Sequence, residues 1–87
     1  MARFLLTHEV LLSAQDQAVD GLRQLAESLP DGLVWVNSWW IPDLGQMVCE
    51  WEGPDLKAIM DALAPFHDTA PVVASHEVER IDPHWYD

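Results

Sequence analysis

The sequence has few positive charges. Its 87 residues include four Lys and Arg against fifteen Asp and Glu, so the formal net charge is −11. The four cations are scattered along the chain, at Arg3, Arg23, Lys57 and Arg80. Because nucleic acids and anionic membranes are bound through basic patches, this distribution argues against both as partners. It is compatible with a metal ion, a cationic ligand or a neutral organic molecule.

Cysteine and long apolar runs are also scarce. Cys49 is the single cysteine, which excludes an internal disulfide. Residues 1–10 lack the charged stretch, apolar run and cleavage site of a secretory signal, so we expect a cytoplasmic protein. No apolar segment approaches the roughly 20 residues needed to cross a bilayer. Without repeats or linkers, the chain should form one domain over residues 1–87, with a C-terminal tail over 82–87.

Apolar and aromatic residues are abundant. Hydrophobic residues make up 49% of the chain, and five of them are tryptophans: Trp35, Trp39, Trp40, Trp51 and Trp85. A domain of this length has a core near the lower limit for independent stability. Exposed indoles commonly mark protein interfaces. We therefore expect a homodimer.

The hydrophobic pattern predicts strand, helix, strand, strand, helix, strand. Strands are expected over residues 2–10, 33–41, 46–52 and 72–81, and helices over 14–29 and from 53–55 to about 65. Ser13 and Asp16 resemble a capping box, and Pro54 with Asp55 suits a helix start. This order is that of the ferredoxin-like βαββαβ fold, an α+β fold. It implies a four-stranded antiparallel sheet in the order 4-1-3-2, with two helices on one face.

This topology gathers residues that are distant in the sequence. The end of the first strand lies beside the starts of the third and fourth strands, so His8 and His67 are expected at one rim of the sheet. Cys49 is expected deeper along the third strand, and Glu52 toward the opposite rim. If Val10 pairs with Val72, His76 lies on the same face as His8.

These residues suggest a metal site. Imidazole is a common ligand of divalent transition metals, and a thiolate would favour nickel, copper or zinc over magnesium or calcium. No pair of candidate ligands has the spacing of a zinc finger or an HExxH motif. The alternative for each histidine is a hydrogen-bonded core or rim residue, and for Cys49 a small buried hydrophobic residue.

One stretch of the chain resembles a known family. Trp35-Val36-x-Ser38, the run from Val48 to Asp55, and the helix leading to His67 are similar to small ferredoxin-like proteins typified by a bacterial nickel-binding protein. In that family the third strand often ends in Cys-x-x-Glu-Ala-Pro, and the first strand carries a histidine like His8.

The resemblance spans most of residues 2–80. Gly53 replaces the family's usual alanine, and residues 83–87 have no counterpart. The resemblance implies a homodimer of facing sheets, the dimeric α+β barrel type. It also implies a divalent metal site at His8, Cys49, Glu52 and His67.

Three functions are therefore considered. The first is a small cytoplasmic homodimer that binds nickel, or alternatively zinc or copper, with ligands drawn from His8, Cys49, Glu52, His67 and His76. The second is a cofactor-free monooxygenase, isomerase or cyclase, with a hydrophobic pocket between sheet and helices and a histidine as general base. A sealed space there would exclude the enzyme. The third is an acidic interaction module whose tryptophan-rich second strand binds a partner.

Overall fold

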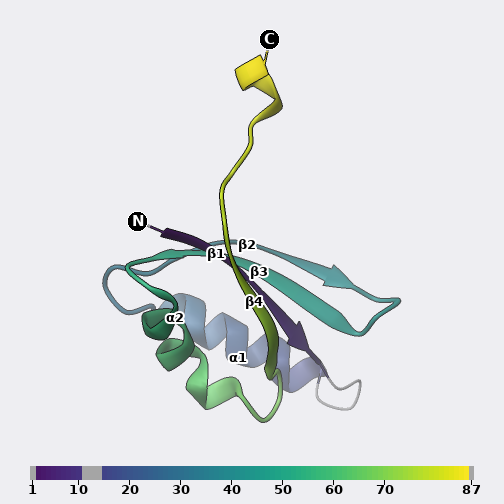
Figure 1. Ribbon diagram of the computed structural model, residues 1–87. Helices are drawn as coiled ribbons and strands as arrows, with labels where there is room; N and C mark the ends of the chain where they lie inside the picture. The colour runs from purple at the N-terminus through teal and green to yellow at the C-terminus, as the bar shows by residue number, and fades with distance from the viewer. Residues whose placement is uncertain (1, 11–14, 87) are drawn as a thin grey trace.

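The computed structural model describes residues 2–10 and 15–86. These residues form the predicted order of strands and helices (Figure 1). The elements are β1 (Ala2–Glu9), α1 (Gln15–Glu27), β2 (Val34–Ile41), β3 (Gln46–Gly53), α2 (Leu56–Leu63), the 3-10 turn η2 (Ala64–Phe66), β4 (Val72–Val78) and the 3-10 turn η3 (Pro83–Tyr86). The helix start predicted at Ala14 and the cap at Ser13 lie outside the described residues. Among the described helices, none has the length and hydropathy needed to span a membrane.

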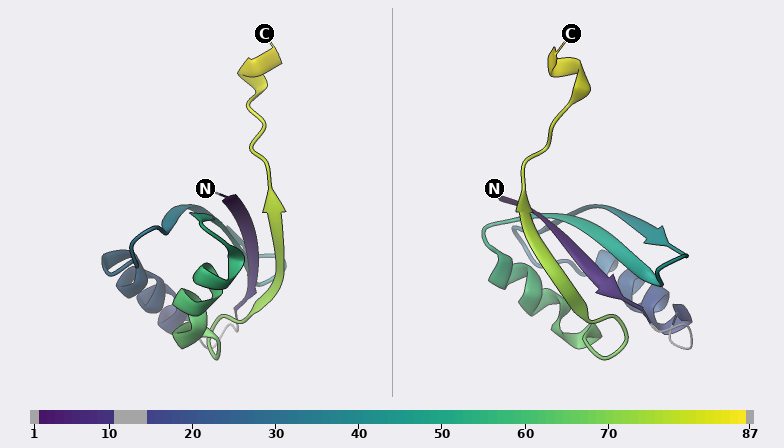
Figure 2. Two further views of the ribbon diagram at one scale, coloured as in Figure 1. Left: turned by 60° about the vertical axis from the view of Figure 1, so that its left-hand side comes forward. Right: turned by 45° about the vertical axis from the view of Figure 1, so that its right-hand side comes forward.

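The four strands form one antiparallel sheet in the order β2-β3-β1-β4. Both helices cover the same face of this sheet. No helix of the described part of the chain covers the opposite face, called the open face below (Figures 1 and 2). Burial alternates along the central strand β1, where Phe4, Leu6 and His8 face the helices and are buried. The predicted ferredoxin-like α+β fold and its strand order are confirmed.

Two bulges change which side chains share a face. In β2 the pairing shifts between Trp35 and Asn37, so Val36 has no partner in the ladder. Trp39 consequently joins Val34 on the open face, whereas strict alternation along β2 would place the two on opposite faces. A second shift in β4 leaves Val73 without a partner. An extra residue in one strand reverses the alternation beyond it.

β4 is shorter than predicted and ends at Val78 rather than near Ile81. Val78 pairs with Arg3, which lies at the start of β1, so the neighbouring strand offers almost no further partners. Residues 79–86, called the C-terminal arm below, leave the sheet and project away from the rest of the molecule (Figures 1 and 2). The radius of gyration is 13.5 Å, against about 12 Å for a compact domain of this length. The arm accounts for this extension.

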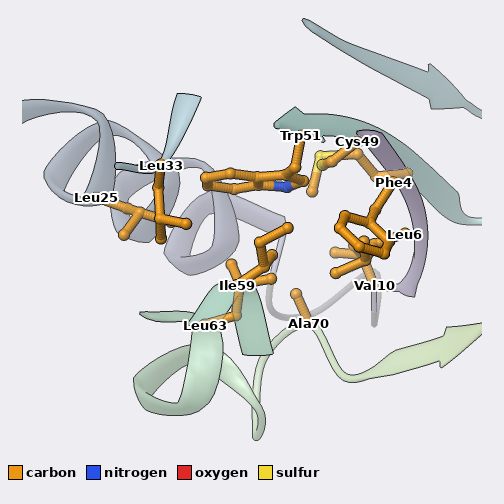
Figure 3. Close-up of a cluster of buried hydrophobic side chains, with 11 residues drawn as sticks. Phe4, Leu6, Val10, Leu25, Leu33, Cys49, Trp51, Ile59, Leu63 and Ala70 are labelled. Atoms are coloured by element: carbon orange, nitrogen blue, oxygen red, sulfur yellow. The ribbon is translucent and has the colours of Figure 1, made fainter. Parts of the chain in front are cut away.

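The hydrophobic core fills the space between the sheet and the helices (Figure 3). Its largest member is Trp51, which has no accessible surface and stacks on Trp35 with ring centroids 5.8 Å apart. Burying an aromatic side chain removes about 150–250 Å² from water, which contributes roughly 4–6 kcal/mol at about 25 cal/mol per Å². Trp51 is therefore a principal source of stability for the layer that carries the candidate site.

Local packing and capping position the two helices. In α1, a Cβ on Gly21 would lie 2.7 and 2.8 Å from two ring carbons of Phe66, so only glycine allows this approach. In α2, the Asp55 carboxylate accepts a hydrogen bond of 2.8 Å from the Ala58 N–H and caps the first turn. The first contact packs α1 closely against the segment after α2, and the second fixes where α2 begins.

Candidate functional site

His8 lies near the end of β1, on the face that the helices cover. Its side chain is 2% exposed and is the one polar side chain among the described buried residues. Its Nδ1 lies 2.9 Å from the carbonyl oxygen of Ala70. The Ala70 segment is itself fixed, because the Ala70 N–H donates to the Phe66 carbonyl at 2.9 Å. The hydrogen bond to this segment therefore fixes the orientation of the imidazole ring.

This contact determines the tautomer of His8. A carbonyl oxygen only accepts hydrogen bonds, so Nδ1 carries the proton and donates it to Ala70. Burial lowers the pKa of His8, and the hydrogen bond to Ala70 opposes this only in part. The ring is thus neutral near pH 7, with its lone pair on Nε2. That atom is buried and has no hydrogen-bond partner among residues 2–10 and 15–86.

Cys49 lies close to His8 on the same face of the sheet. His8 pairs with Met47 and Leu6 pairs with Cys49, so His8 and Cys49 are diagonal neighbours, typically about 7–8 Å apart. The thiol is inaccessible, and Ser38 Oγ donates a 3.0 Å hydrogen bond to its sulfur. Ser38 Oγ in turn accepts a 2.7 Å bond from Trp35 Nε1. Burial raises the pKa of Cys49, so its thiol is protonated near pH 7.

His67 lies at the same end of the domain as His8. It borders an open depression of about 340 Å³, together with Met60, Ala70, Val72 and two residues of the α2 region. Val72 is the strand partner of His8, and Ala70 accepts its hydrogen bond. His8 therefore lies behind the wall of the depression, while His67 is exposed at its rim.

Glu52 and His76 lie elsewhere. Glu52 pairs with Arg3 at the far end of β1, on the open face, where the Arg3 guanidinium contacts both Glu50 and Glu52. The register thus places Glu52 at the opposite rim, as the topology predicted. The expectation that His76 shares a face with His8 is wrong, because the bulge at Val73 pairs His76 with Leu5 on the open face.

The donor set partly fits a transition metal ion. The described residues contain no group of three or more His, Cys, Asp and Glu positioned to hold a metal ion. The unpartnered lone pair of His8 Nε2 nevertheless fits a metal ligand, whose other ring nitrogen usually donates to a carbonyl or carboxylate. Imidazole and thiol donors at this end suit nickel, zinc or copper.

The space that an enzyme pocket would require is filled. Trp51, Ile59 and Leu6 occupy the layer between sheet and helices, and none has accessible surface (Figure 3). Trp51 Nε1 is a second buried polar atom without a partner in this layer. The middle of this layer is therefore packed with side chains.

Two residues near this end were not assigned to the site from the sequence. Ser38 bonds the Cys49 sulfur, and the pairing of β2 with β3 places these residues directly opposite each other. Met60 lines the depression beside His67. Met60 has the helical spacing of a buried residue relative to Leu56 and Leu63, but it is exposed. The contact of Ser38 with Cys49 could have been predicted from the strand register of the β2–β3 hairpin. The position of Met60 depends on how α2 packs on the sheet, which the sequence does not give.

Comparisons with known proteins identify the fold. No protein-family model matches the chain, and neither does any curated protein. Among solved structures, the SCO4226 protein of Streptomyces coelicolor A3(2) superimposes with a TM-score of 0.63 at 19% identity, covering 93% of this chain and 100% of that protein. A protein of Chloroflexus aurantiacus J-10-fl, described as a candidate antibiotic biosynthesis monooxygenase, gives 0.58 at 18% identity and covers 95% of both chains. At these identities the likeness establishes the ferredoxin-like fold and nothing of function.

Proposed function

We propose that the protein is a small metal-binding protein that acts as a homodimer and holds a divalent transition metal ion, nickel being the first choice, at the His8 end of its sheet. The observation that carries this proposal is the His8 Nε2 lone pair. The atom that carries it is buried, the hydrogen bond to Ala70 fixes the ring tautomer, and no described residue is a hydrogen-bond partner for it. Leaving a buried polar atom unsatisfied costs about 1–3 kcal/mol, which a bound ion would offset.

His8 is the proposed anchoring ligand, and His67 and Cys49 are the further ligands that lie at the same end. In the described part of the chain these three side chains are not close enough together to bind one ion. Metal binding would therefore require the segment from Phe66 to Ala70 to move and bring His67 closer to His8. Cys49 would have to lose its thiol proton, which makes affinity rise with pH. Glu52 and His76 are left out of this site because they lie on the open face.

The open face of the sheet is the proposed interface of the homodimer. Three apolar residues of β2 are 43–49% exposed: Val34 and Trp39 on the open face, and Val36 at the bulge. Apolar patches of this kind commonly mark interfaces. A second copy packed against this face would cover them without blocking the His8 end, which lies on the side of the helices.

Metal titration tests the proposal. Nickel should raise the melting temperature of the wild type with increasing concentration, because a ligand that binds the folded state stabilises it by mass action. His8→Gln should abolish this shift, while the matched control His76→Ala should retain it. Equilibrium dialysis of nickel, zinc and copper against the same proteins gives the stoichiometry. Absence of binding to the wild type would overturn the proposal, as would an equal loss of binding in the His76→Ala control.

A further inference from the structure

The C-terminal arm is an extended segment with apolar side chains directed to solvent. Ile81 is 67% exposed and Trp85 is 65% exposed. The arm is nevertheless organised around Asp82, whose side chain accepts from the His84 N–H at 2.9 Å and whose carbonyl accepts from the Trp85 N–H at 3.0 Å. A shaped segment that presents a tryptophan outward is suited to docking on another surface.

A hollow on the open face lies at the root of this arm. It measures about 320 Å³ and is lined from the sheet by Arg3, Leu5, Trp39 and Glu50, and from the end of β4 by residues 78–80. Four residues, 79–82, separate β4 from η3. Extended backbone advances about 3.3 Å per residue, so the turn that carries Trp85 lies about 13 Å beyond the sheet and cannot fill its own hollow without folding back.

We propose that the arm of each chain packs on a second copy of the chain and inserts Trp85 into the hollow at the root of the partner's arm. In a two-fold dimer the same surface meets itself, so a hollow beside the arm root on one copy lies within reach of the arm on the other. This rests on the homodimer proposed above and adds a defined contact to it. It is independent of the metal site.

Charge favours a second copy at this position. Two of the chain's four Lys and Arg residues, Arg3 and Arg80, line the hollow beside Glu50 and Glu79, so this patch is balanced in a chain of net charge −11. Residues 82–87 carry two aspartates and no Lys or Arg. The charges of the four ionised residues that line the hollow therefore cancel, and its two arginines can attract the acidic arm of a second copy. An indole also stacks favourably on a guanidinium plane and on the neighbouring ring of Trp39.

The first test measures the dimer dissociation constant by analytical ultracentrifugation. Trp85→Ala should raise it roughly 30-fold, the loss typical of a central interface tryptophan. Deletion of residues 81–87 should raise it at least as much. Val19→Ala is the matched control, because Val19 is 48% exposed on α1, on the side of the sheet away from the hollow.

The second test measures proximity across the dimer, at a protein concentration high enough to keep the variants dimeric. A tagged chain carrying Trp85→Cys is mixed with an untagged chain carrying Leu5→Cys, so that a disulfide between the two gives a product of distinct mass. This product should form at least tenfold faster than the product of Trp85→Cys with Val19→Cys. Equal rates together with an unchanged dissociation constant for Trp85→Ala would overturn the arm proposal and leave the homodimer standing. A monomeric wild type would overturn both, while nickel binding measured on the same samples would decide the metal site separately.

Discussion

Acidification should destabilise the folded protein through His8. Burial lowers the pKa of His8 in the folded state, whereas in the unfolded chain it returns to about 6.5. Below about pH 6.5 the unfolded state therefore binds one more proton than the folded state. The free energy of unfolding then falls by up to about 1.4 kcal/mol per pH unit until the folded pKa is reached. Above about pH 7 both states are neutral, and His8 contributes no pH dependence.

Urea unfolding between pH 8 and pH 5 measures this effect in the wild type and in His8→Gln. The glutamine amide can still donate to the Ala70 carbonyl but does not titrate. The exposed His67, His76 and His84 are present in both proteins, so the difference between the two curves isolates His8. Protein concentration must be held fixed, because stability of a dimer depends on it. Parallel curves would refute the conclusion that His8 is a neutral, desolvated imidazole.

Three further predictions concern packing, capping and thiol reactivity. Gly21→Ala should destabilise the protein by about 1 kcal/mol in urea unfolding. The added methyl group overlaps the Phe66 ring, and the cost of this overlap exceeds the gain of about 1 kcal/mol in helix propensity. A gain in stability would show that α1 can shift away from Phe66. Asp55→Ala should cost about 1 kcal/mol in the same assay through loss of the Ala58 cap; Asp61→Ala, which removes only an exposed pair with Lys57, is the control and should change stability by less than about 0.5 kcal/mol. Cys49 should not react with a thiol reagent in the native state and should react fully in urea, because it is inaccessible and its pKa is raised; rapid native labelling would contradict its burial.

The sequence was sufficient to predict the fold because each element carried its own signal. Alternation along residues 2–10, helical spacing after Pro54, and the turn before Gly45 together indicate the βαββαβ order. Gly45 adopts a φ of 61°, a conformation that suits glycine at this turn. The end of β1 beside the starts of β3 and β4 then follows from topology, which is why His8 and His67 were placed at one end correctly.

The errors arose from features that local patterns do not encode. The bulge at Val73 moves His76 to the opposite face, and the bulge at Val36 does the same to Trp39. Neither position carries a glycine or another residue that marks a bulge. Gly21 also had no explanation in the sequence, because its contact, Phe66, lies 45 residues further along the chain. The unpartnered state of His8 Nε2 depends on the positions of several elements and could be learned only from the structure.

The most direct test of the metal proposal is the imidazole nitrogen NMR spectrum of His8 during titration with zinc, a diamagnetic substitute for nickel. Before zinc is added, His8 should show a protonated Nδ1 and an unprotonated Nε2 at pH 7. Zinc should then shift the Nε2 resonance of His8 and leave that of His76 unchanged. A His8 spectrum that does not respond to saturating zinc would contradict the assignment of this nitrogen as the metal ligand.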